Sequence, residues 1–277
     1  MNDTGHTRHR NWLERNSTSI RRRVAYLYTR ALCRWRPPIF VLGNQKSGTT
    51  SIAAMLGARA GLQVSLDFPG EVIDPVFDQI QTNQISFDRF VYKNIEQWRA
   101  PIIKEPNLSL LFDEIQQYFP QARFVFIVRH PLDNIRSILN RLNLPGDKEA
   151  LSDEQLDSLP LAWKKIVFNS GLAHLQSDHY VESLALRWQC IANVYRSRPE
   201  SMVLVRYEDF CTDKTGVVDS VCATLGLSAQ GDIAHLLDHQ FHSRGQRDVD
   251  LTAFYGERNL NLITNLCRDG MEYFEYD

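Results

Sequence analysis

The sequence has few cysteines, no long apolar run and little net charge, and each shortage excludes a class of protein. The five cysteines among 277 residues are widely spaced and include no C-x-x-C pair, which argues against a zinc site. No run approaches the ~20 apolar residues of a membrane helix, and none fits a signal peptide. A net charge of −2 gives no strong field for nucleic acid. These features favour a cytoplasmic globular protein with reduced thiols.

The charge is nevertheless unevenly distributed along the chain. Residues 1–38 hold nine arginines and two acidic residues, a charge of +7, so the remainder carries −9. We expect residues 1–37 to form a basic helical extension and residues 38–277 to form one domain. The extension either packs on the domain or touches anionic lipid or a partner, and the sequence leaves both open. It also leaves the oligomeric state open.

Short apolar runs alternate with helical patterns in this domain. Such alternation is typical of an α/β fold, a single P-loop-like parallel sheet of about five strands with helices on both faces. The expected strands are Ile39–Leu42, Leu62–Leu66, Pro101–Lys104, Phe124–Val128 and Met202–Val205. The expected helices are Thr49–Ala60, Leu108–Tyr118, Leu132–Leu142, Val181–Ser197 and Lys214–Leu225, with another near Val76–Ile80. Ligands of such sheets bind beyond the carboxyl ends of the strands.

The first strand runs into the segment GNQKSGTT, which resembles a phosphate-binding loop with a displaced lysine. Gly43 and Gly48 have the spacing of the two glycines in G-x-x-x-x-G-K-[ST]. However, Thr49 occupies the place of the lysine, and Lys46 lies inside the loop. Backbone N–H groups of such a turn, followed by a helix N-terminus, form an anion site. The segment therefore predicts a phosphate site of an unusual kind.

The fourth strand runs into RHPLDNIRS, which offers a second anion site. Arg129 follows the strand, Pro131 opens the next helix, and Ser137 lies almost two turns into it. An arginine and a serine so placed can hold a phosphate through charge-assisted hydrogen bonds. The alternative is a surface ion pair between Arg129 and Asp133. A kinase of small metabolites would need an acidic residue here to hold Mg²⁺, so a cation argues against that class.

Together, QKSGTT and RHPLDNIRS resemble the sulfotransferases that use 3′-phosphoadenosine 5′-phosphosulfate (PAPS) and release 3′,5′-adenosine bisphosphate (PAP). The segment ending in VRYEDF, Val205–Phe210, is also similar to that family. By this resemblance Lys46 lies at the oxygen between phosphorus and sulfur, and Arg129 and Ser137 hold the 3′-phosphate. No metal is implied. The implied site for the 5′-phosphosulfate is Lys46, Ser47, Gly48, Thr49, Thr50 and Ser51.

Two parts of the donor site match the family less closely. Ser51 stands where the family often has a tryptophan stacked on adenine, so adenine must be held differently. Tyr207 matches a tyrosine that contacts adenine in relatives, or it is a buried aromatic residue at a strand end. Arg244 and Gly245, in FHSRGQRD, are the best match to the family's basic loop over the 3′-phosphate.

The acceptor needs a general base to take its proton. Pro106 occupies the place where cytosolic relatives have a histidine, so that base is absent here. Carbohydrate-type relatives use a glutamate after the second strand, which makes Glu71 the first candidate and Glu105 the second. Lys104 matches a family lysine that orients the acceptor or the donor.

The acceptor itself is expected to be a small molecule carrying a hydroxyl or an amine. The chain lacks the luminal anchor of the family's Golgi members, which favours a free cytoplasmic enzyme. Aromatic residues in the segment 144–180 line an acceptor pocket or pack in the core: Trp163, His174, His179 and Tyr180. Two other functions stay open, a P-loop kinase and a non-catalytic module that binds phosphoadenosine nucleotides.

Overall fold

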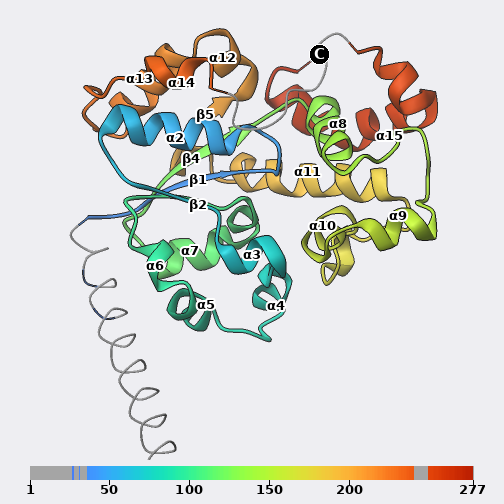
Figure 1. Ribbon diagram of the computed structural model, residues 1–277, viewed down its shortest axis with the longest axis horizontal. Helices are drawn as coiled ribbons and strands as arrows, with labels where there is room; N and C mark the ends of the chain where they lie inside the picture. The colour runs from blue at the N-terminus through green and yellow to red at the C-terminus, as the bar shows by residue number, and fades with distance from the viewer. Residues whose placement is uncertain (1–26, 28–30, 32–35, 240–248, 277) are drawn as a thin grey trace, which may run out of the picture.

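Five parallel strands form the centre of the molecule in a computed structural model that describes residues 27, 31, 36–239 and 249–276 (Figure 1). The strands are β1 Ile39–Gly43, β2 Val64–Leu66, β3 Ile102–Lys104, β4 Arg123–Val128 and β5 Met202–Arg206. Their order in the sheet is β2-β3-β1-β4-β5, and every neighbouring pair is parallel. The predicted α/β fold with a parallel sheet is therefore confirmed.

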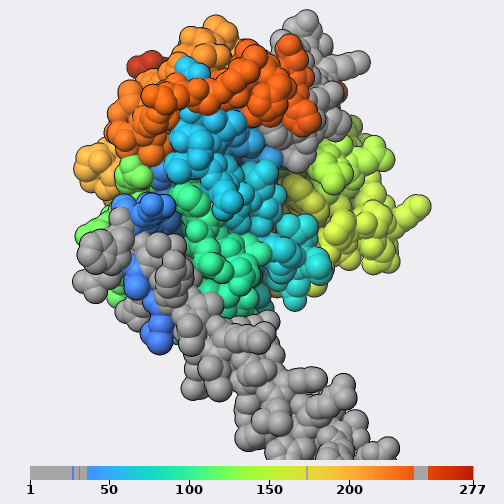
Figure 2. Space-filling view, turned by 60° about the vertical axis from the view of Figure 1, so that its left-hand side comes forward, coloured from blue at the N-terminus to red at the C-terminus, as the bar shows by residue number. Residues whose placement is uncertain are grey.

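The alternation of side chains along β1 divides the core into two layers. Ile39 and Val41 pack with residues of α2 (Thr49–Ala60) and α13 (Lys214–Thr224) on one face of the sheet. Figure 2 shows α2 beside the orange helices of the segment around α13, on the same side of the molecule. Phe40 and Leu42 pack on the opposite face. Since both faces are covered, the strands read as continuous apolar runs rather than alternating ones.

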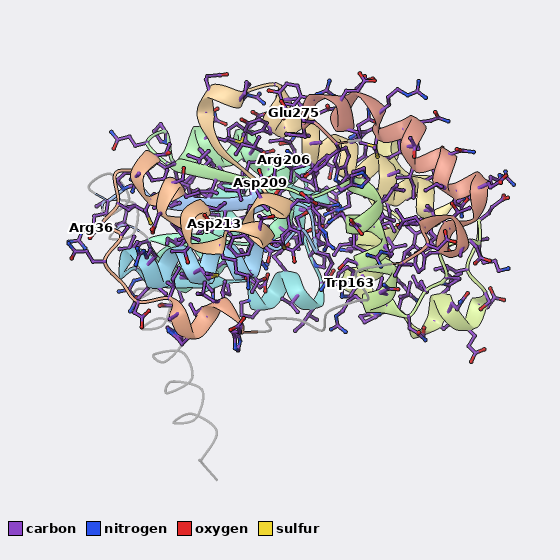
Figure 3. The ribbon with its side chains drawn as sticks, turned by 90° about the horizontal axis from the view of Figure 1, so that it is seen from above. Arg36, Trp163, Arg206, Asp209, Asp213 and Glu275 are labelled. Carbon is purple, nitrogen blue, oxygen red and sulfur yellow. The ribbon has the colours of Figure 1, made fainter. Side chains whose placement is uncertain are left out.

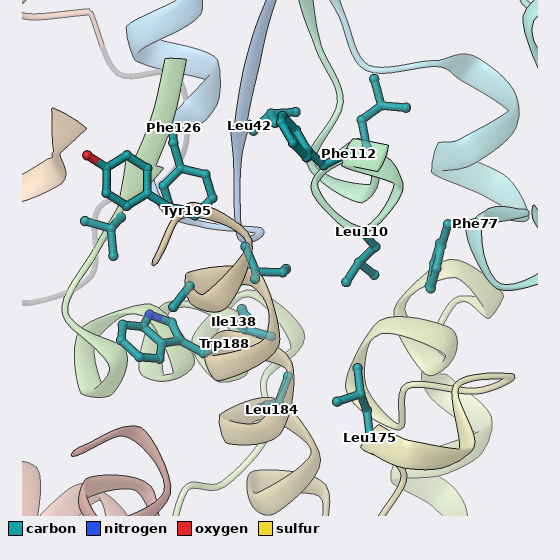
Figure 4. Packing of buried hydrophobic residues seen from close by; sticks show 14 of the residues in the cluster. Leu42, Phe77, Leu110, Phe112, Phe126, Ile138, Leu175, Leu184, Trp188 and Tyr195 are labelled. Carbon is teal, nitrogen blue, oxygen red and sulfur yellow. The ribbon is translucent and has the colours of Figure 1, made fainter. Parts of the chain in front are cut away.

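The opposite face is covered by α7 (Phe112–Tyr118), α8 (Pro131–Leu142), α11 (Tyr180–Arg196) and α15 (Leu251–Tyr273). In Figure 4, Phe126 of β4 lies against Tyr195 of α11, with ring centroids 5.4 Å apart. Trp188 and Leu184 continue the same buried surface along α11. This packing fixes α11 against the sheet, and α8 and α15 lie against α11 in turn.

Two excursions leave the sheet at the carboxyl ends of its strands. The first, between β2 and β3, contains α3 Pro69–Ile73, α4 Phe77–Gln81, α5 Phe87–Lys93 and α6 Ile95–Trp98, and α4 is the helix expected near Val76–Ile80. The second, between α8 and α11, contains α9 Asp153–Ser158, α10 Leu161–Val167 and η2 Ala173–Leu175. In this excursion Tyr180 is fully buried and its hydroxyl donates to the carbonyl of Pro145, so Tyr180 belongs to the core.

The remaining short helices are η1 Pro106–Leu111, η3 Pro199–Ser201, α12 Tyr207–Thr212 and α14 Ala234–Leu237. Most of the expected basic extension lies outside the described residues, so the boundary at residues 37 and 38 stays a prediction. Of the described cysteines, Cys222 and Cys267 are buried, Cys190 is half-buried and Cys211 is exposed. No helix in the described part of the chain is long and apolar enough to cross a membrane.

Candidate active site

The loop between β1 and α2, Asn44–Gly48, is called the β1 loop below, and glycines shape both of its ends. Gly43 has φ 145°, and a Cβ there would lie 2.5 Å from the carbonyl oxygen of Ile127. Gly48 has φ 89°, and a Cβ would lie 2.3 Å from the ring of Tyr207. Lys46 also adopts a left-handed conformation, with φ 64°. Such backbone strain in a non-glycine residue is often kept at binding sites.

The β1 loop leads into a helix N-terminus that no side chain caps. Gly48 is the N-cap residue of α2, and it offers no side-chain acceptor for the first N–H groups of the helix. These groups and the helix dipole favour an anion in front of the loop. Thr50 and Ser51 are half-buried in the first turn, whereas Thr49 and Ser47 are buried. The site thus offers backbone N–H groups with hydroxyl groups beside them.

Positive charges surround Lys46. Burial first, and then the charges of Arg141, Arg129 and Lys104, lower the pKa of Lys46 to about 8. Arg141 was not among the expected site residues; it is exposed on α8, one helical turn beyond Ser137. A bound anion would relieve the repulsion among these cations. The arrangement is therefore suited to a multiply charged anion.

Arg129 reaches the β1 loop rather than Asp133. Its Nη1 donates to the carbonyl oxygen of Lys46 at 2.9 Å, and its guanidinium stacks over the Tyr207 ring at 4.6 Å. The Nε of Arg129 is buried and has no partner among the described residues. Asp133 instead pairs with Arg136 at 2.7 Å. The expected alternative, an ion pair between Arg129 and Asp133, is wrong, and a donor of Arg129 stays free for a ligand.

Helix α8 supports the β1 loop through Asn134. The Nδ2 of Asn134 donates to the Gln45 carbonyl oxygen at 2.8 Å and to the Ser47 hydroxyl at 3.1 Å. Its Oδ1 accepts from Asn44 Nδ2 at 2.8 Å. Ser137 lies one turn further along α8 and is half-buried. By helical spacing, Ser137 therefore lies on the same face of α8 as Asn134.

Residues at the ends of β2 and β3 form a second group of charges. Lys104 Nζ pairs with Asp67 at 2.5 Å. The carboxylate of Glu105 accepts from the backbone N–H groups of Phe68 and Asn107, both at 3.1 Å. Glu71 accepts from the single N–H of Val76, at 3.3 and 3.1 Å. Lys104, Glu105 and Glu71 are all buried, with 4%, 3% and 5% of their surfaces exposed.

Burial changes the acidity of both glutamates. It raises the pKa of Glu71 to about 8, with a further rise from the charge of Glu105. It raises the pKa of Glu105 to about 7, and Asp67 adds to this rise while Lys104 opposes it. Carboxyl groups with pKa values near neutrality are suited to proton transfer.

Three supporting residues escaped the sequence analysis. Arg187 and Trp188, consecutive on α11, contact the two phosphate-binding segments: Arg187 Nε donates to Gln45 Oε1 at 3.1 Å, and Trp188 Nε1 donates to the Arg129 carbonyl at 2.9 Å. Glu208 accepts from the backbone N–H of His130 at 3.0 Å and from the Tyr276 hydroxyl at 2.7 Å. The motifs ALRWQ and YED contain these residues, but spacing alone does not show what they contact.

The last described residues, Glu275 and Tyr276, contact the residues that follow β5. In Figure 3, Arg206 and Glu275 lie close to each other, and Arg206 Nη2 donates to the Glu275 carbonyl oxygen at 3.1 Å. Arg206 also stacks on Tyr276, with its Cζ atom 4.8 Å from the ring centroid. The turn that carries Arg129 is therefore held by the segment after β5, which residues 275 and 276 beyond α15 contact in turn.

The structure brings most of the expected donor residues together. The β1 loop, Arg129 and Tyr207 are in mutual contact, whereas the role of Ser137 stays a prediction. Arg244 and Gly245 lie outside the described residues, so their role stays a prediction. The electrostatic coupling of Lys104 to Lys46, and of Glu105 to Glu71, connects the donor residues with the expected catalytic ones.

A parallel sheet with anion-binding groups beyond its carboxyl edge defines the class as an α/β protein of the P-loop-like kind. A model of the sulfotransferase family matches residues 71–231, more than half of the chain. The chain therefore belongs to the sulfotransferase family. The matched residues begin after the β1 loop, so the loop supports the assignment independently of the family model.

Two solved sulfotransferase structures resemble this chain in fold. Mouse sulfotransferase SULT7A1, complexed with PAP, is 15% identical, with a TM-score of 0.50 over 87% of this chain and 89% of the mouse chain. A sulfotransferase from Alicyclobacillus acidocaldarius is 16% identical, with a TM-score of 0.47 over 84% of this chain and 96% of its own. At such identities the mouse structure supports the fold alone. No curated protein matches the sequence.

Proposed function

We propose that this protein transfers the sulfuryl group of PAPS to a hydroxyl or amine of a small-molecule acceptor, in line and without a metal ion. The observation that carries the proposal is the group of cations around the β1 loop, in which Arg141, Arg129 and Lys104 lower the pKa of Lys46. The buried Nε of Arg129, which has no partner among the described residues, also supports the proposal, because a phosphate oxygen of the donor could accept its hydrogen bond.

The donor side consists of the β1 loop, the first turn of α2, Arg129 and α8. In the proposal, the loop N–H groups with Ser47, Gly48, Thr49, Thr50 and Ser51 hold the 5′-phosphosulfate. Arg129 and Ser137 hold the 3′-phosphate, and Arg244 and Gly245 close over it. Tyr207 offers a ring to the adenine beside Gly48. Because Arg129 already stacks on Tyr207, the phosphate contact and the ring contact would form together.

PAPS supplies a sulfuryl group whose bond to the 5′-phosphate oxygen breaks as the acceptor oxygen or nitrogen bonds to sulfur. Lys46 neutralises the charge that develops on the bridging oxygen, and PAP leaves. The acceptor's proton passes to a carboxylate. The protein thus contributes positioning and electrostatic stabilisation, which need no covalent intermediate.

The acceptor side consists of the ends of β2 and β3 with α3, and Glu71 is its favoured general base. Glu105 uses its two oxygens to accept from two separate backbone N–H groups, as a cap does. Glu71 shares one N–H between its oxygens, so lone pairs remain for an acceptor's proton. In the proposal, Lys104, which pairs with Asp67, orients the acceptor or the sulfuryl group.

Exposed apolar side chains near Glu71 support an acceptor with an apolar part. From residue 36 onward, the large apolar side chains exposed in the described chain are Leu66, Val72, Ile73, Leu161 and Tyr273. All but Tyr273 belong to β2, α3 or α10, and α10 packs against α3. Lys165 of α10, one turn beyond Leu161, ties the two helices together through Asp74 at 2.8 Å. An apolar group lying here would be beside the proposed base.

Calorimetric titration with PAP tests the donor, with and without Mg²⁺ and with ATP as the control. PAP is a sensible probe because a mouse protein of the same fold was solved with it. We expect metal-independent binding of PAP and weak binding of ATP. A preference for Mg²⁺–ATP would overturn the proposal in favour of a kinase. Binding of PAP without turnover of PAPS on alcohols, phenols or amines would indicate the non-catalytic module.

A further inference from the structure

Arg187 is a buried cation without an ionic partner. It lies in the middle of α11 with 0% of its surface exposed. No carboxylate forms an ion pair with it in residues 36–239 or 249–276. Burial lowers its pKa to about 10, against smaller opposing effects of Cys190 and the Glu105 carboxyl, and so leaves it charged at neutral pH. A buried charge without an ionic partner is expensive, because the protein interior solvates it less well than water does.

Three side-chain amides replace the missing counter-ion. Their oxygens accept from the guanidinium: Gln45 Oε1 from Nε at 3.1 Å, Asn107 Oδ1 from Nη2 at 3.0 Å, and Asn169 Oδ1 from Nη1 at 3.4 Å. The Cζ atom also lies 5.2 Å from the centroid of the Phe77 ring. Amide dipoles and a ring solvate the charge but do not neutralise it.

The amide orientations are fixed by their other contacts. Gln45 Nε2 donates to Asn107 Oδ1 at 2.8 Å, so its Oε1 must face Arg187. Asn169 Nδ2 donates to the carbonyl oxygens of Leu175 and Ser183, at 2.9 and 2.7 Å. The network therefore has one consistent arrangement, and it holds the positive charge in one place.

Each amide belongs to a different part of the proposed site. Gln45 precedes Lys46 in the β1 loop, and Asn107 donates its backbone N–H to Glu105. Asn169 follows α10 and has a left-handed φ of 49°. The next residue of α11, Trp188, holds the carbonyl of Arg129. One turn of α11 thus connects both phosphate-binding segments with the acceptor side.

We propose that Arg187 is a positioning residue whose buried positive charge is balanced by the anionic donor, so that it favours the nucleotide-bound state without touching the nucleotide. The inference rests on the proposed function, because it assigns the counter-ion to the donor held by the β1 loop. The charge acts through Gln45, the residue before Lys46, whose side-chain amide it orients and polarises. Donor binding then compensates a charge that, in the free protein, meets the Glu105 carboxyl only through a weaker interaction without an ion pair.

A neutral variant separates this role from a purely structural one. In Arg187→Met, which keeps a long side chain, the amide oxygens of Gln45 and Asn169 lose the donor that Arg187 provides, so we expect the free protein to unfold at a somewhat lower urea concentration than the wild type. We expect the affinity for PAP to fall about tenfold or more, as for a lost charge-assisted contact. A purely structural role predicts that the folded variant binds PAP with the affinity of the wild type, and that result would overturn the inference.

A second variant keeps the arginine and neutralises it in place, in case Arg187→Met does not fold. Asn107→Asp puts a carboxylate oxygen where the amide oxygen now lies, 3.0 Å from the Nη2 atom of Arg187. The expected result is a folded protein with weakened PAP binding and a raised KM for PAPS, but with a smaller change in kcat. Unchanged PAP affinity in a folded Asn107→Asp protein would refute the inference.

The wild type distinguishes the two possible failures. If the wild type does not bind PAP, the proposed function fails and the counter-ion is not this donor. If the wild type binds PAP and both folded variants bind it equally well, only the role of Arg187 fails. Arg268→Ala, which removes an exposed arginine of α15, is the matched control and should leave PAP affinity unchanged.

Discussion

The donor side and the acceptor side of the proposed site differ in the sign of their charge. The donor side gathers Lys46, Arg129 and Arg141 around a loop held by neutral amides. The acceptor side gathers Asp67, Glu71 and Glu105, with Lys104 paired to Asp67 and Lys165 acting on Glu71. Charges of the same sign repel one another within each side. Lys104 interacts electrostatically with Lys46 on the donor side and with Glu105 on the acceptor side.

This contrast brings two opposite groups to a similar acidity. Burial and neighbouring cations lower the pKa of Lys46 to about 8, while burial and a neighbouring carboxyl raise the pKa of Glu71 to about 8. A base whose pKa lies near the working pH can accept a proton and release it again. The difference between the two sides therefore suits one to hold an anion and the other to remove a proton.

The largest effect is expected from removing the central cation of the donor side. Lys46→Ala should lower kcat by about 10²–10³, because the developing charge on the bridging oxygen loses its partner. PAP binding should change much less, since the loop N–H groups and Arg129 remain. Single-turnover transfer from PAPS and PAP calorimetry measure the two quantities. Lys93→Ala, on the exposed end of α5, is the control. Normal transfer by Lys46→Ala would remove the lysine from the mechanism.

On the acceptor side, Glu71→Gln should lower kcat by about 10² while stabilising the fold. In the wild type, the raised pKa of Glu71 means that the stability contributed by its neutral form is present below pH 4.5 and is lost as the pH rises to about 8. The glutamine variant escapes that loss, so its advantage in thermal stability should be larger at pH 8 than at pH 5.

The activity of the wild type should follow the same titration. Transfer should increase as the pH rises toward 8, because Glu71 must be deprotonated to act as a base. If Glu71→Gln keeps full activity, or gains no stability at pH 8, the role of general base would pass to Glu105. Glu105→Gln measured in the same way is the direct comparison.

Loss of the proposed contact between Arg129 and the 3′-phosphate should weaken nucleotide binding more than it lowers kcat. Arg129→Ala removes both the contact with the Lys46 carbonyl and the stacking on Tyr207, so the Kd for PAP should rise about tenfold or more. Adenosine 5′-phosphosulfate, which lacks the 3′-phosphate, should bind the variant and the wild type with similar affinity. An equal loss for both nucleotides would show that Arg129 shapes the loop instead of holding the 3′-phosphate.

The smallest effect is expected at the rim of the acceptor side. Ile73 is 73% exposed beside Glu71, so Ile73→Ser should fold normally and raise KM about threefold to tenfold for an alcohol with a long alkyl chain. KM for a short alcohol and the affinity for PAP should not change. Tyr273→Ser, on the exposed surface of α15, is the matched control. An equal change for both alcohols would exclude an apolar acceptor at this rim.

The sequence by itself determined the sheet and the β1 loop. Apolar runs of four to five residues followed by glycine or charged residues are local signals, and all five expected strands and helix α2 lie where they were predicted. The β1 loop depends on Gly43 and Gly48 at fixed spacing, which local chemistry requires. Only the tertiary structure explains why residue 48 must be a glycine: a Cβ atom there would collide with the ring of Tyr207, which is distant in the sequence.

Helix α15 shows where local signals fail. It contains Gly256, with φ 66° at an internal kink, and Gly270, which packs against Trp188. Glycine and asparagine weaken the helical pattern of this segment, so the sequence did not predict it. Its burial against α11 and α8 stabilises it instead.

Only the tertiary structure decided which polar residues support the site. Arg187, Asn107, Asn169 and Gln45 are far apart in the sequence, and single polar residues on apolar segments give no signal of a shared network. The same holds for the two glutamates, whose acidity depends on burial by segments that follow different strands. Short-range patterns fix elements because they depend on neighbouring residues, whereas charge, burial and pKa depend on what the fold brings together.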